Sequence, residues 1–333
     1  MRKILRLIII IAITACVACG ERKADTLPAS SGKPFEVILT SNDSTAADLV
    51  SKALSKTCVG LPQDEPMFDV VRTGNGSIDT STRVARAVVV IAIDSTLYDK
   101  VGLQYERDLY AEPQIVVSIT ARDNDMLQHD MPRTERWLSE QITRMEMDAA
   151  YKTLLRRNNP VAERNALSQM DVVTHIPGDL TSSKAGTNFL WLSNNAAEGM
   201  QNVCIYTYPG LDTTTPTFIA MRDSIMKENM PGEEPEMHMT TGKGSVGRRI
   251  VKEKDGERSC FVGLWEMEGD MMGGPFVAHA LADTARKRVV VVEGFVYAPE
   301  QRKRNLIRRM EAVLFSTHVR RPIAHSPSSE KNI

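Results

Sequence analysis

The sequence predicts an α+β protein of two domains, each built on a mainly antiparallel sheet with helices packed mostly on one face. Short apolar runs typical of strands fall into two groups, one within residues 35–120 and the other within residues 188–299. Segments with helical spacing gather apart from the strands in each half, which is the pattern of α+β domains. With 333 residues, the chain is long enough to bury two separate cores.

The first group of strands predicts an N-terminal domain over residues 34–158. We expect strands at 35–40, 67–72, 87–93 and 114–120, and a helix over 45–56 after the first strand. The run at 87–93 is apolar without alternation, which is typical of a central strand covered on both faces. Apolar residues at helical spacing then predict a long helix over 123–157, which Asn158-Asn159-Pro160 ends.

The second group predicts a C-terminal domain over residues 159–319. It begins with a short helix over 161–170, followed by strands at 188–192 and 202–208 and a helix over 217–230. A Gly- and Pro-rich loop at 231–247 leads to a strand near 248–253 and three further strands before residue 299. A helix over 300–317 closes the domain, and residues 320–333 lack apolar periodicity and are predicted to be a disordered tail.

The first nineteen residues have the pattern of a lipoprotein signal peptide. Three basic residues precede position 7, and Leu7–Ile13 is apolar but too short to span a bilayer. Small residues then precede Cys16 and Cys19, as they do where bacterial lipoproteins are cleaved and acylated. We predict lipidation at Cys19, with Cys16 as the alternative, and an ordinary cleaved signal peptide is the competing interpretation. Residues 20–33 then form a polar tether.

Charge and cysteine content narrow the classes of function. The net charge of −1 gives no electrostatic case for binding nucleic acid. The basic residues around 248–258 and 286–288 suit either lipid phosphates or a charged sheet edge. Cys58, Cys204 and Cys260 are widely spaced in apolar surroundings, so buried thiols are expected, with a Cys204–Cys260 disulfide as the alternative.

The sequence contains no recognisable metal, cofactor or nucleophile motif. Met237-His238-Met239, Met271-Met272 and His279 are soft ligands, but their spacing does not support a copper site, so no metal is predicted. Gly242-Lys243-Gly244-Ser245 lacks the spacing of a phosphate-binding loop, and no Gly-x-Ser-x-Gly elbow is present. These patterns favour a non-enzymatic protein without a cofactor.

The stretch from Phe261 to Phe276 is the candidate binding surface. An apolar strand leads into an acidic, Met-rich turn, and paired glycines, which permit positive φ or a close backbone approach, start the next strand. We predict a binding cleft between the turn at 264–275 and the loop at 231–247. The candidate residues for this surface are Trp265, Asp270, Gly273, Gly274, Phe276 and Tyr297. For Trp265, packing in the core is the competing interpretation.

Glu293 is the most unusual ionisable residue because it shares the register of Val291 and Phe295 on an apolar strand face. A carboxylate in such a place needs a partner or a raised pKa. It is a candidate general acid or base together with Glu266 on a neighbouring strand, which would make the protein an envelope hydrolase. The competing interpretation is a structural ion pair, for instance with Arg222.

Several motifs together resemble one protein family. They are Leu27–Pro34, Leu61–Pro66, Ile205–Pro209, Arg222-Asp223, Met239–Thr241, Gly263–Glu266, Met272–Phe276 and Glu293–Pro299. Across essentially the whole mature chain, the set is similar to a Bacteroidetes lipoprotein family known as domain of unknown function 4837 (DUF4837). The resemblance implies a lipoprotein of a bacterial cell envelope and implies no reaction. The order of elements in the C-terminal half is also similar to Mog1/PsbP-like folds, whose members usually bind or assemble other molecules.

The sequence thus predicts a lipid-anchored envelope protein, at the outer rather than the inner membrane, that binds an envelope protein or a small ligand and no nucleic acid. The alternative is the envelope hydrolase that uses Glu266 and Glu293.

Overall fold

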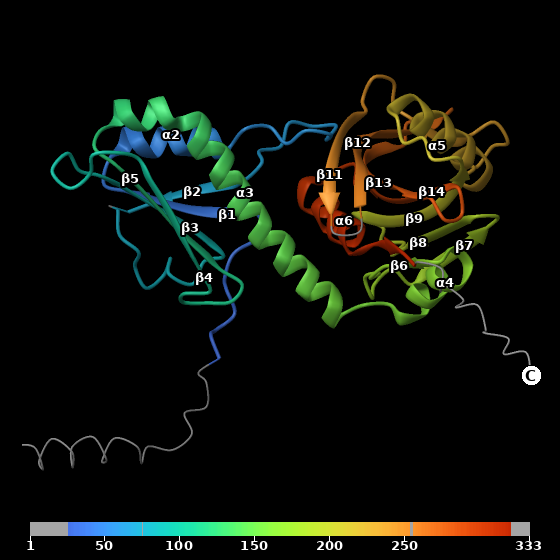
Figure 1. Cartoon of the computed structure of the whole chain (residues 1–333), viewed down its shortest axis with the longest axis horizontal. Coiled ribbons are helices and arrows are strands. Elements are labelled where there is room, and N and C mark those ends of the chain that lie inside the picture. The colour runs from blue at the N-terminus through green and yellow to red at the C-terminus, as the bar shows by residue number, and fades with distance from the viewer. Residues whose placement is uncertain (1–25, 75, 254–255, 321–333) are drawn as a thin grey trace, which may run out of the picture.

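The computed structural model describes residues 26–74, 76–253 and 256–320. The expected signal peptide, the first part of the tether, both candidate lipidation sites (Cys16 and Cys19) and the tail from residue 321 lie outside the described residues. The described chain forms two α+β domains, each with its own sheet, which confirms the predicted fold class (Figure 1). None of the helices in the described ranges is long and apolar enough to cross a membrane.

The N-terminal domain packs two helices on a five-stranded sheet. Its elements are β1 (Glu36–Ser41), α2 (Ser44–Leu54), β2 (Asp69–Thr73), β3 (Ala87–Ile93), β4 (Gly102–Arg107), β5 (Ile115–Ala121) and α3 (Asn124–Arg156). Both helices bury their apolar side chains, such as Val50 and Ile142, against the same face of the sheet. The expectation that helices cover mostly one face therefore holds in this domain.

The strands of this domain differ from the expected direction. The order is β2-β1-β3-β5-β4; the pairs β1–β2, β1–β3 and β3–β5 are parallel, and only β4 runs antiparallel to its neighbour. The N-terminal sheet is thus mainly parallel, not mainly antiparallel. The burial of β3 fits this direction, since the strands of parallel sheets are usually covered on both faces. Val89 and Ile91 face the helices, and Val88 packs with Ala85 on the other side of the sheet.

The C-terminal domain is built on one large antiparallel sheet. Its elements are α4 (Pro160–Met170), β6 (Val172–Val173), β7 (Ser182–Gly186), β8 (Phe189–Ser193), β9 (Met200–Pro209), α5 (Thr215–Asn229), β10 (His238–Thr241), β11 (Gly247–Glu253), β12 (Gly256–Glu268), β13 (Gly273–Asp283), β14 (Arg288–Tyr297), α6 (Arg304–Ser316) and β15 (His318–Val319). The strand order is β10-β12-β13-β14-β9-β8-β7, with β11 also paired to β12. The expected loop at 231–247 therefore contains a short strand, β10.

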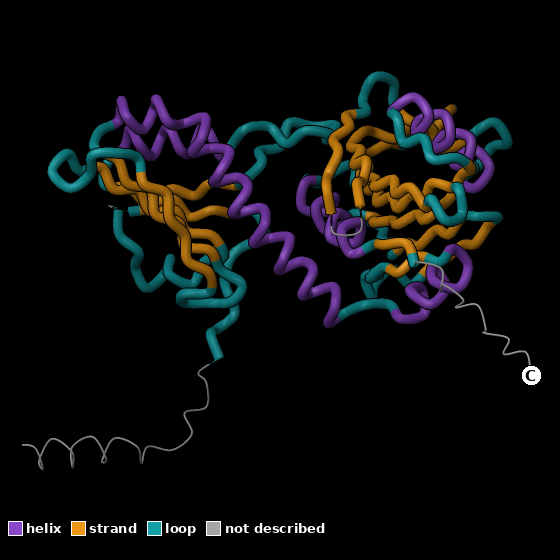
Figure 2. Tube along the Cα trace, viewed as in Figure 1, coloured by secondary structure: helices purple, strands orange, loops and turns teal. Residues whose placement is uncertain are grey.

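Helices cover both faces of this sheet, which corrects the expectation of one covered face (Figure 2). α5 packs Phe218 and Met226 on one face, and α4 and α6 pack on the other. The central strands β13 and β14 are buried along nearly their whole length, so neither face can be left to solvent. Gly294 lets α6 approach closely, because a Cβ there would lie 2.4 Å from the Cβ of Met310.

A carboxylate from the N-terminal domain joins the two domains at the start of α6. The side chain of Glu65, in the loop between α2 and β2, accepts hydrogen bonds from the backbone N–H groups of Lys303 (2.6 Å) and Arg304 (3.0 Å). No side chain of α6 itself caps this end, so Glu65 supplies the missing acceptor and complements the helix dipole. Arg304 donates in return to the carbonyl of Pro66 and to Asp69, both at 2.6 Å.

Candidate functional site

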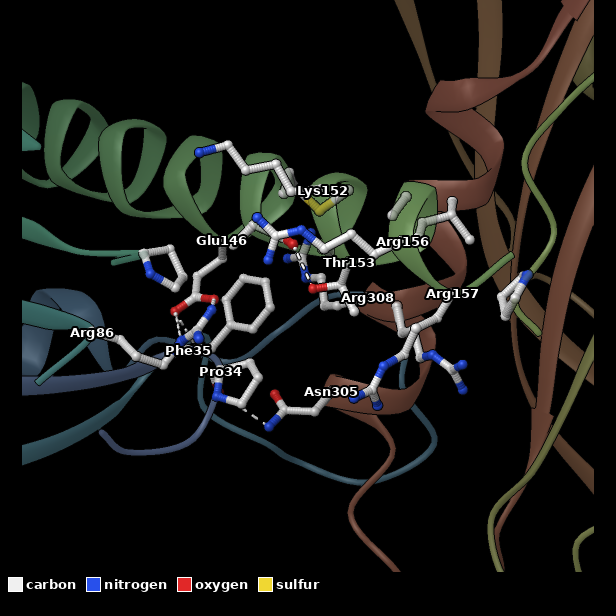
Figure 3. Close-up of a pocket in the computed structure, with 18 of the residues that line it drawn as sticks. Pro34, Phe35, Arg86, Glu146, Lys152, Thr153, Arg156, Arg157, Asn305 and Arg308 are labelled. Carbon is white, nitrogen blue, oxygen red and sulfur yellow. Dashed lines mark hydrogen bonds and ion pairs between the residues drawn. The ribbon is translucent and has the colours of Figure 1, made fainter. Parts of the chain in front are cut away.

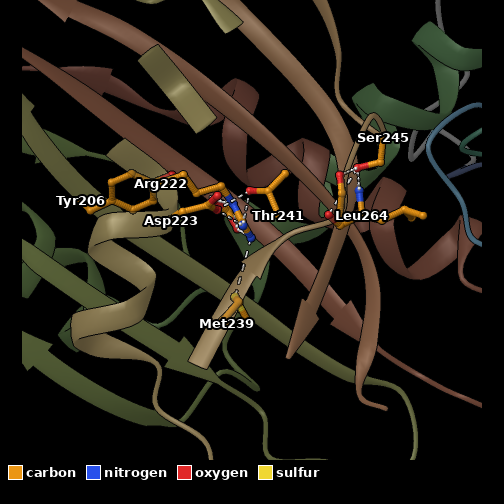
Figure 4. Close-up of polar contacts among 9 residues, drawn as sticks. Tyr206, Arg222, Asp223, Met239, Thr241, Ser245 and Leu264 are labelled. Carbon is orange, nitrogen blue, oxygen red and sulfur yellow. Dashed lines mark hydrogen bonds and ion pairs between the residues drawn. The ribbon is translucent and has the colours of Figure 1, made fainter. Parts of the chain in front are cut away.

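Glu293, the first catalytic candidate, forms a closed ion pair inside the C-terminal domain. Arg222 of α5 donates to its carboxylate from Nη2 at 2.8 Å and from Nε at 3.0 and 3.2 Å, and both side chains are 0% exposed. Tyr206 donates its hydroxyl to the same carboxylate at 3.0 Å, and Arg222 also donates to Thr241 at 2.9 Å. Figure 4 shows Arg222 between Tyr206 and Thr241.

The electrostatics of this cluster favour a permanent ion pair. Burial alone would lower the pKa of Arg222, but the adjacent Glu293 charge and its hydrogen bonds raise that pKa above its ordinary value. Burial and the Glu293 charge raise the pKa of Tyr206 well above its usual range, so the phenol stays protonated and donates. The structure therefore favours the structural ion pair with Arg222 over an acid or base that reaches a substrate.

Glu266, the second catalytic candidate, lies on the opposite face of the sheet. Trp265 points into the core on the α5 side, so the next residue along β12 points away from it and is exposed. Strand β13 also separates β12 from the β14 strand that carries Glu293. The structure does not bring the two carboxylates together, so it argues against a hydrolase that uses them as a pair.

Three of the six residues of the predicted binding surface, Trp265, Gly274 and Phe276, are buried in the core. Trp265 is 2% exposed and donates its ring N–H to the carbonyl of Val296 at 3.2 Å. Phe276 is fully buried, with the Arg222 guanidinium 4.3 Å from its ring centre. Asp270 is exposed and Tyr297 is half-buried. Few of the residues predicted to form a surface between the 264–275 turn and the 231–247 loop are therefore accessible to a ligand.

Gly273 and Gly274 lie in strand β13 and are required for close packing. Neither has a positive φ; in this turn that conformation belongs to Gly269, with φ of 80°. A Cβ on Gly274 would lie 2.1 Å from the carbonyl oxygen of Val296, and one on Gly273 would lie 2.9 Å from that of Trp265. Of the two reasons considered for paired glycines, close backbone approach is the one that the structure shows.

The three cysteines of the described ranges form no disulfide with one another. Cys58, Cys204 and Cys260 are buried and unpaired. Strands β14 and β13 separate Cys204 from Cys260, about 14 Å across three strand spacings, which is beyond the reach of a disulfide. Within the described ranges, no cluster of three or more His, Cys, Asp or Glu side chains could hold a metal ion.

A cleft with basic lining lies where the two domains meet. This basic cleft has a volume of about 890 Å³ and is formed by the C-terminal half of α3, the segments at 27–35 and 112–113, the loop at 177–179 and one side of α6. Figure 3 shows Lys152 and Arg156 of α3, with Arg157 directly after the helix, around the same space as Asn305 and Arg308 of α6. Its charged lining consists of six basic residues (Arg86, Lys152, Arg156, Arg157, Arg308 and Arg309) and three acidic ones (Glu112, Glu146 and Asp179).

A second cleft lies beside it and serves as an internal comparison. This neutral cleft, of about 1060 Å³, is formed by α3, α6, the loop at 58–60 and strands β11 to β13. Its charged lining is balanced, with four basic residues (Arg144, Arg248, Arg249 and Arg308) and four acidic ones (Glu140, Asp148, Glu253 and Glu311). A surplus of positive charge is therefore a property of the basic cleft and not of the domain junction as a whole.

Sequence reasoning placed no site at this junction. The available signal was the pair of Arg-Arg dipeptides, Arg156-Arg157 and Arg308-Arg309, each in a predicted helix. Exposed arginines at helix ends are common, and it is the contacts of α6 with the N-terminal domain, among them its capping by Glu65 and the bond from Arg304 to Asp69, that bring these two helices to the same cleft.

The two domains match two different family models. Residues 159–316 match Domain of unknown function (DUF4837), and residues 30–154 match Domain of unknown function (DUF8532). The expected match to DUF4837 is thus confirmed for residues 159–316, while the N-terminal half, which was expected to share it, matches the second family. No curated protein matches the chain. Neither description names an activity, and the basic cleft lies where the two matched regions meet.

Proposed function

We propose that this protein is a lipoprotein of a bacterial cell envelope that acts as a non-enzymatic binding or assembly factor, with the basic cleft as its ligand site. The observation that carries the proposal is the cleft itself. Ligand sites are typically concave, of about 300–1,000 Å³, and often lie between domains, and the basic cleft meets each condition. Glu65 and Asp69 bind α6 to the N-terminal domain, which fixes the position of the α6 wall of the cleft relative to the α3 wall.

The expected lipid anchor would place this cleft near a membrane. Leu27 and Ala29, at the end of the tether, line the cleft, and Leu27 follows Cys19 by eight residues. Even a fully extended tether of that length spans no more than about 28 Å. An anchor on Cys19 would thus keep the cleft within about 28 Å of the bilayer, and one on Cys16, eleven residues before Leu27, within about 40 Å. We propose that this bilayer is the outer rather than the inner membrane.

Membrane fractionation tests the anchor. Replacing Cys16 and Cys19 together by Ser should release the protein into the soluble fraction, because firm attachment needs the acyl chains. Replacing only the acylated cysteine should have the same effect, and separating the two membranes by density should place the wild-type protein in the outer one. Membrane association of the double variant that survives a high-salt wash would contradict the lipoprotein proposal.

Site-specific photo-crosslinking in living cells tests the binding site. A photoreactive residue at Thr153, in the basic cleft, should yield a defined adduct, whereas one at Asp270, on the turn predicted from sequence, should not. Adducts formed from Asp270 alone would show that the functional surface is the one predicted from sequence at the 264–275 turn, and not the basic cleft.

A further inference from the structure

We propose that the basic cleft binds a phosphate group, carried either by a lipid headgroup or by a free phosphorylated compound. The inference rests on the proposed function, because it names the chemistry of the ligand for the same site.

Every acidic side chain in the lining already has a basic partner. Glu146 pairs with Arg86 at 2.5 Å, Glu112 with Lys152 at 2.9 Å, and Asp179 with Arg309 at 2.5 Å. The hydrogen bonds from Arg309 hold the pKa of Asp179 below its usual range. The hydrogen bond and charge of Lys152, with a smaller contribution from the charge of Arg156, do the same for the pKa of Glu112, so both carboxylates stay charged.

Two guanidinium groups remain without an ion-pair partner. Arg308 pairs with Glu311 just outside the cleft, at 2.8 Å, whereas Arg156 and Arg157 form no ion pair with any residue that the structure describes. Both are exposed, at the last turn of α3, and open into the cleft. The charge of Glu112, which Lys152 already pairs, also acts on Arg156 at longer range. Since Arg308 is paired with Glu311, the cleft still carries a surplus of two positive charges beyond its ion pairs.

The number and shape of these charges favour phosphate. A guanidinium offers a planar fork of donors that matches the oxygens of phosphate or carboxylate. A phosphate monoester carries about −1.5 to −2 charges at pH 7, which balances two guanidinium groups, whereas one carboxylate would balance only one. The volume of about 890 Å³ leaves room for the group that bears the phosphate.

A purely local role for the two arginines makes a different prediction. Cations near a helix C-terminus stabilise the helix dipole, so Arg156 and Arg157 would then affect the stability of α3 and not phosphate affinity.

The test uses the full-length protein with Cys16→Ser and Cys19→Ser, so that no acyl chain binds membranes by itself. One arm measures binding of inorganic phosphate and glycerol 3-phosphate by calorimetry, and the other measures flotation with phosphatidylcholine vesicles that contain or lack phosphatidic acid. The test variant is Arg156→Gln/Arg157→Gln, and the matched control is Arg144→Gln/Arg249→Gln, which removes the same charge from the neutral cleft alone.

We expect the test variant to lose at least tenfold in affinity for whichever probe binds, and the control to stay within twofold. Binding of the soluble phosphates identifies a free phosphorylated compound as the source, and binding only to vesicles with phosphatidic acid identifies a lipid headgroup. Equal losses in both variants, or a stability change in the test variant without a change in affinity, would overturn the proposal. If Thr153 still yields a photo-adduct in cells but no probe binds, the ligand site stands and the phosphate assignment is wrong; if neither occurs, both fail.

Discussion

Replacing Glu293 by Gln tests whether the buried pair with Arg222 stabilises the C-terminal domain. The substitution keeps the shape of the side chain but removes its charge, which leaves the fully buried Arg222 guanidinium with only the more distant, partly exposed Asp223, 3.7 Å from its Nη1. Breaking a buried ion pair in this way costs about 3–5 kcal/mol. Because 1 kcal/mol shifts the Tm of a domain of this size by about 2–4 °C, the Tm should fall by about 6–20 °C.

Urea unfolding followed by circular dichroism gives the free energy directly. Glu266→Gln is the matched control, since Glu266 is exposed on the other face, and it should change the free energy of unfolding by less than about 0.5 kcal/mol. Replacing Arg222 by Met and Glu293 by Leu together removes both charges and should recover most of the loss. A loss below about 1 kcal/mol for Glu293→Gln, or a double variant no more stable than the single one, would refute the structural interpretation of this pair.

Three further predictions follow from the packing. Gly274→Ala should lower the free energy of unfolding in urea by about 1–3 kcal/mol, because the new Cβ would overlap a carbonyl oxygen. The control Gly247→Ala, whose Cβ would have its nearest contact at 3.4 Å, should leave that free energy unchanged, and equal losses in the two variants would contradict the close-packing argument. Burial and nearby arginines lower the pKa of His279 to about 3, so below about pH 6.5 only the unfolded state binds a proton at this residue. The wild type should therefore lose about 2 kcal/mol of stability between pH 8 and pH 5, and His279→Gln should not show this loss. The same pH dependence of stability in His279→Gln as in the wild type would count against this. Glu65→Ala should cost about 1–3 kcal/mol and speed hydrogen exchange in the first turn of α6, while the exposed Asp64→Ala should leave both unchanged.

Local pattern predicted most elements but not the direction of their pairing. The apolar run at 87–93 correctly indicated a strand buried on both faces, and the long helix over 123–157 matches α3 within a residue at each end. Whether β1, β2 and β3 run parallel depends on how crossovers such as α2 return the chain, and this information is not contained in any single run of residues.

The site was predictable only where burial forces a pairing. Glu293 stood out because a carboxylate on an apolar face needs a partner, and Arg222, named as one, is that partner. The basic cleft offered no comparable signal, because Arg156 and Arg157 look like ordinary solvated residues at a helix end. Their proximity to α6 depends on contacts between residues far apart in sequence, such as Glu65 and Lys303, which are 238 residues apart.

Arginine footprinting tests most directly the central claim that the basic cleft is the ligand site. Phenylglyoxal modifies accessible guanidinium groups, and mass spectrometry of the digested protein reports the rate at each position, with and without a detergent extract of the native envelope. If the cleft is the ligand site, the extract should slow the modification of Arg156 and Arg157 and leave the rates at Arg144 and Arg249, in the neutral cleft, unchanged. Equal rates at Arg156 and Arg157 with and without extract, or protection confined to Arg144 and Arg249, would contradict it.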